Sequence, residues 1–380
     1  MSDHIERLTL KDYGPVKDLS VRLTPLHAFI GPNDSGKSTL LRAMRTAVQL
    51  AGSTFTLDER DQPEPFDPGL VSALKHSAKE ARIEVCWRNV IYRVWDPGNI
   101  TKEIYHQAVI HRFDVDEEML VDGQQVLAQR RKTRKGPRKR SSLSALRAGD
   151  KPSIVEARRF FWRGAHMLRL DPDALREPSP LITGPWEAGF EDERGRGLPG
   201  VYDLILNQKV DGFLAIQERV RALFPGIKAI GLENVSASTK EIRAQITSGE
   251  WISARFLSEG LLYYLAFAAL QYLERPAVLL VEEPENGLHP ARIAEVMRIL
   301  REISKETQVL IATHSPLVVN EMQPEEVSVV TRKPETGTKV TLLADTPDFE
   351  ARSKIYALGE LWIAYANGED EAPLLEGREP

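Results

Sequence analysis

The stretch FIGPNDSGKSTLLRAM, residues 29–44, joins an apolar run to a glycine-rich turn and then to apolar residues at helical spacing. The turn, residues 31–39, fits the pattern G-x-x-x-x-G-K-[ST] at every fixed position. Its glycines let the backbone wrap so that successive N–H groups point at phosphate oxygens, and the positive end of the following helix adds to this attraction. The stretch therefore predicts a phosphate-binding loop between a strand and a helix.

The residues of this loop have expected roles in binding a nucleoside triphosphate, with ATP and Mg²⁺ as the expected cofactors. Lys37 is expected to reach the β- and γ-phosphates, and the Ser38 hydroxyl is expected to ligate Mg²⁺. The other positions assigned to the same nucleotide site are Gly31, Pro32, Asn33, Asp34, Ser35, Gly36 and Thr39.

Two adjacent acids follow a second apolar run in AVLLVEEPENGLHP, residues 277–290. Glu282 and Glu283 would stand at the carboxyl end of a buried strand, where paired carboxylates are costly unless a cation offsets them. We expect Glu282 to hold Mg²⁺ and Glu283 to act as the general base on the attacking water. A solvated loop after a structural strand is the alternative interpretation.

A third strand end carries a histidine, in VLIATHSP at residues 309–316. Ligands of parallel α/β sheets bind at the carboxyl ends of the strands. His314 is therefore a candidate catalytic residue that hydrogen-bonds the γ-phosphate. A histidine used for packing or left on the surface is the alternative.

A polar tip precedes a long apolar run in RFLSEGLLYYLAF, residues 255–267. Ser258 can be the N-cap of a buried helix with Glu259 in its first turn. The tip can also be a phosphate-binding helix start aimed at a nucleotide held by another copy of the chain. In that second interpretation Ser258, Glu259 and Gly260 belong to the nucleotide site.

The composition indicates an ordinary soluble globular protein, with 42% hydrophobic and 28% charged residues among 380. The longest apolar run, residues 261–270, is too short for a membrane span, which takes about 20 residues. Cys86 is the only cysteine, so an internal disulfide and a cysteine-based zinc cluster are excluded. Because the first residues are charged where a signal peptide is apolar, we expect a cytoplasmic protein with no membrane partner.

The four motifs, in this order, resemble the ABC-type ATPases of the SMC and RecF kind. They are most similar to the OLD (overcoming lysogenization defect) family and its relatives among bacterial AAA-type ATPases. The resemblance spans residues 5–345 and includes GLPGVYDLILNQ and LFPGI. Its counterparts are Walker A at residues 31–38, the signature at 257–260, Walker B at Glu282 and Glu283, the D-loop at 286–288 and the switch histidine at His314.

Alternating strands and helices predict an α/β protein with a mainly parallel sheet flanked by helices. The resemblance implies a P-loop NTPase of ABC type with an antiparallel β subdomain and a helical lobe that carries the signature. The expected domains are a first part of ATPase lobe I at residues 1–150, the helical lobe at 151–274, a second part of lobe I at 275–345 and a tail at 346–380.

The resemblance also implies an ATP-hydrolysing enzyme that pairs head to tail, so that Ser258 and Gly260 bind the γ-phosphate on the opposite subunit. Glu259 stands where transporter ATPases carry glycine. Typical OLD proteins continue into a Toprim nuclease domain, but no Toprim-like acidic motif follows His314. We therefore expect a nucleotide-dependent switch in an anti-phage defence complex that gates a separate nuclease or toxin chain.

Other functions stay open at this point. A RecF-like DNA-repair ATPase would bind DNA directly, without an effector chain. A transporter's nucleotide-binding subunit is disfavoured by the LSEG signature and the paired glutamates. A scaffold that binds ATP without turnover is the remaining alternative.

A basic run, RRKTRKGPRKR from Arg130 to Arg140, holds eight cations and no acid in a chain of net charge -5. It predicts an exposed loop that binds nucleic acid without sequence preference, because cations track phosphates and no aromatic residue is present for stacking. A solvated loop, or one that docks an acidic protein, is the alternative.

Two further residues have open roles. Gln62 could contact Mg²⁺ as a Q-loop residue, or it could be a plain loop glutamine. Tyr13 could stack on adenine, although a core role is favoured.

Overall fold

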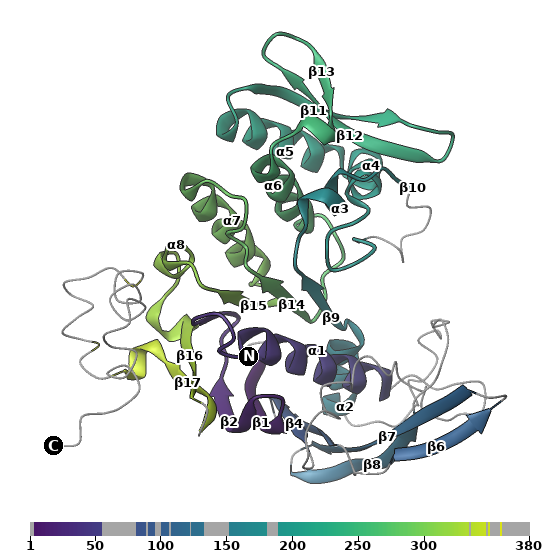
Figure 1. The fold of residues 1–380 in the computed structure, drawn as a ribbon, viewed down its shortest axis with the longest axis vertical. Helices are drawn as coiled ribbons and strands as arrows, with labels where there is room; N and C mark the ends of the chain where they lie inside the picture. The colour runs from purple at the N-terminus through teal and green to yellow at the C-terminus, as the bar shows by residue number, and fades with distance from the viewer. Residues whose placement is uncertain are drawn as a thin grey trace.

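A six-stranded sheet forms the centre of the described chain, with the strand order β17-β16-β3-β15-β14-β9 (Figure 1). This computed structural model describes residues 4–54, 81–88, 90–95, 100–105, 108–121, 123–132, 152–180, 189–333, 336–346, 349 and 358. The five strands from β16 to β9 run parallel, and β17 is antiparallel to β16. The predicted α/β fold with a mainly parallel sheet is confirmed. The strands are β3 (Leu26–Ile30), β9 (Ala165–Leu168), β14 (Val278–Glu282), β15 (Gln308–Thr313), β16 (Val327–Lys333) and β17 (Gly337–Leu342).

Helix α1 (Lys37–Thr54) lies between this sheet and a second, antiparallel sheet (Figure 1). It contacts β9, β14 and β15 on one side and β4 and β5 on the other. The antiparallel sheet has the order β2-β1-β4-β5-β7-β6, with β8 beside β7. Its strands are β1 (Ile5–Tyr13), β2 (Val16–Arg22), β4 (Arg82–Trp87), β5 (Val90–Trp95), β6 (Ile100–Tyr105), β7 (Ala108–Val121) and β8 (Gln124–Lys132).

The central strands are apolar throughout because both of their faces are buried. Val278 and Leu280 of β14 pack into the core that contains α1, whereas Leu279 and Val281 pack into the core on the opposite face. This alternation follows from the two-residue period of a strand. A sheet covered on both faces leaves the ends of its strands for binding.

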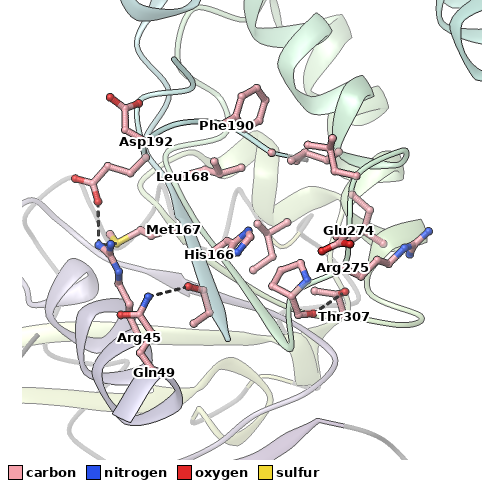
Figure 2. A pocket seen from close by; sticks show the side chains of 18 of the residues that line it. Arg45, Gln49, His166, Met167, Leu168, Phe190, Asp192, Glu274, Arg275 and Thr307 are labelled. Atoms are coloured by element: carbon pink, nitrogen blue, oxygen red, sulfur yellow. Dashed lines mark hydrogen bonds and ion pairs between the residues drawn. The ribbon is translucent and has the colours of Figure 1, made fainter. Parts of the chain in front are cut away.

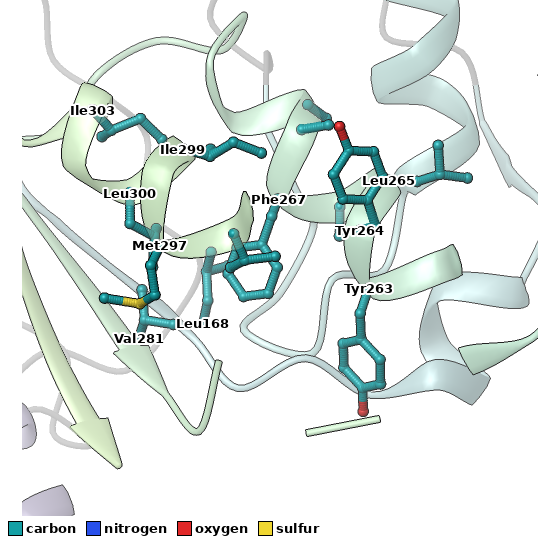
Figure 3. Packing of buried hydrophobic residues seen from close by; sticks show 14 of the residues in the cluster. Leu168, Tyr263, Tyr264, Leu265, Phe267, Val281, Met297, Ile299, Leu300 and Ile303 are labelled. Carbon is teal, nitrogen blue, oxygen red and sulfur yellow. The ribbon is translucent and has the colours of Figure 1, made fainter. Parts of the chain in front are cut away.

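Helices α6 (Glu259–Leu270) and α7 (Pro290–Ile303) belong to the core on the face opposite α1. Figure 3 shows Met297 and Phe267 beside Val281 and Leu168 in this layer. Every residue of α6 from Leu261 to Ala269 is buried, because α7 contacts one side of the helix and α3, α4 and α5 contact the other. Among the described helices, none is long and apolar enough to cross a membrane.

The lobe around α6 combines helices with a small antiparallel sheet of order β10-β12-β11, in which β13 pairs with β12. Its hydrophobic residues join the same core as α7. The elements are α3 (Pro172–Arg176), β10 (Ser179–Pro180), α4 (Leu198–Gln208), α5 (Val210–Leu223), β11 (Ile227–Asn234), β12 (Thr239–Ile246), β13 (Trp251–Ser253) and η5 (Ala254–Phe256). The remaining short helices are α8 (Pro316–Asn320), η6 (Pro324–Glu326) and η7 (Leu343–Asp345).

The expected start of the helical lobe at residue 151 needs correction. Helix α2 (Pro152–Trp162) packs on α1, and β9 is the edge strand of the central sheet. Both belong to the layers of the ATPase lobe, because β9 satisfies its backbone groups by pairing with β14 and α2 buries Phe160 and Phe161 in the α1 core. The lobe with the signature therefore begins after Leu168.

The expected loop from Arg130 to Arg140 is also wrong at its beginning. Residues 130–132 form the end of β8, where Arg130 is the partner of Asp116 on β7. A 14-residue β7 is long enough to pair with the start of the basic run. Residues 133–140, Gln62 and most of the 346–380 tail lie outside the described residues.

Candidate functional site

The predicted phosphate loop joins β3 to α1 and has backbone angles that its sequence explains. Gly36 has a φ of 111° and Asp34 has a φ of 64°. Glycine reaches positive φ without steric cost, and a short polar side chain tolerates it. Gly31 is required for another reason: a Cβ atom there would lie 2.1 Å from the carbonyl oxygen of Val330 on β16.

The side chain of Lys37 folds back over this loop. Its Nζ donates hydrogen bonds to the carbonyl oxygens of Gly31, at 2.6 Å, and Pro32, at 2.7 Å. Burial lowers the pKa of Lys37, and four carboxylates oppose this lowering. The loop lysine and the acids of the second motif are thus close enough to interact electrostatically. These acids are Glu283, Glu285 and Glu282, and the fourth carboxylate is that of Asp34 in the loop itself.

The loop is also held by β16 and β17, which lie on the side of β3 away from β15. The Thr338 hydroxyl on β17 donates to the carbonyl oxygen of Ser35 at 2.8 Å. Arg332 on β16 donates to the carbonyl oxygen of Asp34 at 3.4 Å. The sequence carries no local signal for either contact, because the partners are about 300 residues apart along the chain. They fix the loop that would bind phosphate.

Glu282 ends β14 with only 5% of its side chain exposed. Its Oε1 is buried without a hydrogen-bond partner, and its Oε2 lies 3.6 Å from Nε of Arg169. A buried carboxylate oxygen without a hydrogen-bond donor is costly, and a neighbouring cation offsets this cost. The unpartnered oxygen of Glu282 therefore fits a ligand of Mg²⁺, and the Ser38 hydroxyl in the first turn of α1 stays the expected second ligand.

Few protein groups are placed to hold Mg²⁺, as is usual where phosphate oxygens supply other ligands of the ion. Within the described ranges, no group of three or more His, Cys, Asp or Glu residues is placed to hold a metal. Mg²⁺ that is bound by one or two protein groups and by phosphate oxygens needs no such group. The Ser35 hydroxyl oxygen in the phosphate loop is also buried without a hydrogen-bond partner, which fits a polar ligand at this site.

Glu283 is held in a strained backbone conformation, with a φ of 48°. Its N–H donates to the carbonyl oxygen of Ala312 on β15 at 2.8 Å. Its Oε2 accepts a hydrogen bond of 2.7 Å from the Asn286 side chain, and its Oε1 lies 3.5 Å from Nδ1 of His314. The candidate base and the candidate phosphate-sensing histidine therefore lie side by side.

Glu285 is a site residue to which the sequence assigned no role. Its Oε1 accepts hydrogen bonds from the Thr313 hydroxyl at 2.7 Å and from the His314 N–H at 3.3 Å. Nδ1 of His314 is 3.6 Å from the same oxygen. A third acid in EEPEN was the available signal, but only the pairing of β14 with β15 brings it to the histidine.

Ser258 of the signature caps α6, whereas Leu257 before it is buried in the core. The Ser258 Oγ accepts a hydrogen bond from the Leu261 N–H at 3.4 Å, which confirms the N-cap. Ser258 and Glu259 are exposed. A Cβ on Gly260 would lie 3.0 Å from the carbonyl oxygen of Gly287, so the helix tip touches the D-loop segment of its own chain.

Tyr13 does not reach this site from the surface. Its side chain is 1% exposed in the core beside α1, and burial raises its pKa to about 12. The core role is confirmed, and the adenine-stacking alternative is wrong.

A cavity of about 220 Å³ opens along β9, but it is not the predicted site (Figure 2). Residues of α1, β9, the segment 189–193 and the end of α6 line it, including Arg45, His166 and Leu270. None of the residues expected to bind nucleotide lines it. The predicted site lies instead at the strand ends.

A family model described as "AAA domain, putative AbiEii toxin, Type IV TA system" matches residues 112–320, more than half of the 380 residues. The chain belongs to this AAA-domain family. A second model, described as "AAA ATPase domain", matches residues 4–116 of the chain. No curated protein matches the chain.

Solved structures show the fold of this AAA domain. An SMC head bound to the C-winged helix domain of ScpA has a TM-score of 0.53 at 16% identity, covering 89% of this chain and 97% of that chain. An SMC head with an extended coiled coil, bound to the C-terminal domain of ScpA derived from Pyrococcus furiosus, has a TM-score of 0.51 at 16% identity and covers 93% and 99%. The predicted α/β fold is confirmed, and it is similar to the fold of these SMC heads. Membership of the OLD family stays a prediction.

Proposed function

We propose that this AAA domain binds ATP with Mg²⁺ at the carboxyl edge of its central sheet and hydrolyses it. One observation carries the proposal: the loops after β3, β14 and β15, which are neighbouring parallel strands, bring Lys37, Glu282, Glu283 and His314 to one edge. Of these groups, the two carboxylates act on the pKa of Lys37, and His314 lies beside Glu283. This is the edge where α/β sheets bind ligands.

Each side chain has a task that its position supports. Lys37 and the loop N–H groups bind phosphates, and Ser38 and Glu282 hold Mg²⁺. When bound, the ion neutralises charge on the phosphates. Glu283 takes the proton of the attacking water, and His314 orients Glu283 and hydrogen-bonds the γ-phosphate.

The signature tip is proposed to serve a second copy of the chain. Ser258, Glu259 and Gly260 stand at the N-terminus of a 12-residue helix, whose partial positive charge favours phosphate. Ser258 and Glu259 are exposed and are not packed in the hydrophobic core. A head-to-tail dimer would place each tip over the nucleotide of the partner, with two ATP molecules between the subunits.

The biological setting is proposed from the family description, which names a toxin of a type IV toxin–antitoxin system. We assign the chain to a cytoplasmic, OLD-like switch of an anti-phage defence complex, in which the ATP state gates a separate nuclease or toxin. The alternative is a RecF-like ATPase that binds DNA directly. The basic run from Arg130 to Arg140 favours that alternative, because eight cations would attract nucleic acid without sequence preference.

The first test replaces the proposed base. Glu283→Gln should keep ATP affinity while phosphate release falls at least about a hundredfold, because a positioned base contributes that much or more. The measurements are ATP titration and a phosphate-release assay, with the exposed Glu325→Gln as control. Turnover at the wild-type rate in Glu283→Gln would show that the base is another group.

Lys37→Ala tests the phosphate loop. Loss of ATP binding in this variant, measured by the same titration, would show that the bound nucleotide occupies the predicted loop.

A further inference from the structure

Arg169 stands at the same sheet edge as the proposed nucleotide site, directly after β9. Its Nε lies 3.6 Å from Oε2 of Glu282, whose side chain is 5% exposed. The Arg169 side chain itself is 63% exposed. A surface guanidinium therefore reaches inward to a buried carboxylate that is proposed to hold Mg²⁺.

The backbone under Arg169 is anchored to the segment around residue 193. The Arg169 N–H donates to the carbonyl oxygen of Glu193 at 2.7 Å, and the Asp171 N–H donates to that of Arg194 at 3.0 Å. The Glu193 carboxylate in turn lies 3.0 Å from Nη1 of Arg45 on α1. Because the main chain is held on both sides, rotation of the long side chain is the motion open to Arg169.

Arg169 lies on Oε2 of Glu282, and Mg²⁺ held by the unpartnered Oε1 would put a second cation on the same carboxylate. Lys37 is engaged by the carbonyl oxygens of Gly31 and Pro32, which leaves Arg169 as the cation that is paired with Glu282 in this structure. Two cations on one carboxylate repel each other, and in a partly buried site that repulsion is weakly screened. A guanidinium also binds phosphate oxygens well.

We infer that Arg169 is a metal-responsive positioning residue of the nucleotide site, an inference that rests on the proposed function. It neutralises Glu282 when no metal is bound and exchanges this carboxylate for a phosphate oxygen when Mg²⁺ and the triphosphate bind. Arg169 thus supports nucleotide binding without metal and competes with Mg²⁺ for Glu282.

The test measures ATP affinity in the Glu283→Gln background, where turnover does not interfere, first in EDTA and then across a Mg²⁺ titration. Arg169→Gln should bind ATP about three- to tenfold more weakly in EDTA, because the Glu282 carboxylate is then no longer neutralised and repels the phosphates. The Mg²⁺ concentration that gives half of the metal-dependent gain should fall about two- to fivefold, because the competing cation is gone. A purely structural role would not shift these two quantities in opposite directions.

Arg194→Gln is the matched control, since Arg194 is an exposed arginine of the adjacent segment that pairs with Asp171. Arg169→Lys keeps the charge and should lie between wild type and Arg169→Gln. An unchanged Mg²⁺ dependence in Arg169→Gln, or the same change in Arg194→Gln, would overturn the inference while leaving the proposed function intact. Absence of ATP binding by the Glu283→Gln protein itself would instead overturn the proposed function.

Discussion

Glu285 joins the two loops that carry the proposed catalytic residues. One carboxylate oxygen accepts from the Thr313 hydroxyl and from the His314 N–H, so it fixes the loop after β15 against the loop after β14. The same oxygen is 3.6 Å from Nδ1 of His314 and orients its ring. We therefore assign Glu285 as a positioning residue that acts through His314.

Glu285→Ala should lower turnover about ten- to a hundredfold with little change in ATP affinity, because His314 and Glu283 lose their alignment. Phosphate release and ATP titration separate the two quantities. Glu285→Gln keeps an oxygen acceptor for the Thr313 hydroxyl and should recover part of the rate. Equal turnover in wild type and Glu285→Ala would contradict the positioning role.

His27 couples the stability of the central sheet to pH. It is fully buried on β3, with Nδ1 3.1 Å from the Thr24 hydroxyl and Nε2 2.9 Å from the Ser328 hydroxyl. Burial lowers its pKa from 6.5 to about 3. The neutral ring is therefore the form that the folded protein accommodates.

Stability contributed by neutral His27 is present above pH 6.5 and is lost as the pH falls toward 3, because only the unfolded chain takes up the proton in that window. The unfolding free energy should fall by up to about 1.4 kcal/mol per pH unit from this group alone. Urea unfolding at several pH values, with wild type and His27→Gln compared, measures it. A His27→Gln variant with the wild-type slope would show that the pH dependence arises elsewhere.

At the scale of elements, α1 is defined by what packs on both sides of it. It starts in the phosphate loop, passes between two sheets and ends against α2. Gly52 lies near this end, where a Cβ would stand 2.4 Å from the carbonyl oxygen of Phe161. The backbones of α1 and α2 touch because residue 52 has no side chain.

Gly52→Ala tests which effect dominates. Helix propensity favours alanine by about 1 kcal/mol, whereas a side chain forced against backbone costs about 1–3 kcal/mol. Because the upper part of the cost range exceeds the gain, we expect a net loss of up to about 2 kcal/mol in the free energy of unfolding, measured with urea. Gly226→Ala, where a Cβ meets nothing within 4 Å, is the control. A Gly52→Ala protein that is more stable than wild type would show that α1 and α2 separate easily.

At the scale of the whole molecule, the proposed enzyme is incomplete as one chain. The phosphate loop and the acids lie at the edge of the central sheet. The Ser258 tip caps α6, which packs in the core on the face of the sheet opposite α1. If the tip completes the pocket of a second copy, ATP binding and association are linked, since each ATP is then bound by both subunits.

The Glu283→Gln protein should be monomeric without nucleotide and dimeric with ATP and Mg²⁺, as measured by light scattering. Adding Ser258→Arg should block the dimer and keep ATP binding to the single chain, because the bulky side chain would enter the pocket of the partner. Ser238→Arg, at an exposed turn of the same lobe, should leave the dimer unchanged. A dimer that persists in the Ser258→Arg variant would place the interface elsewhere.

The sequence alone determined the elements whose signals are local. The phosphate loop needs glycine and lysine at fixed spacing, and the buried strands are apolar throughout. Tertiary structure decided what depends on distant partners. Pairing of β9 with β14 moved residues 165–168 out of the expected helical lobe and brought Arg169 to Glu282, and pairing of β14 with β15 brought Glu285 to His314. The reason is physical: local spacing sets backbone conformation, whereas the neighbour of a strand end is set by the order of strands in the sheet.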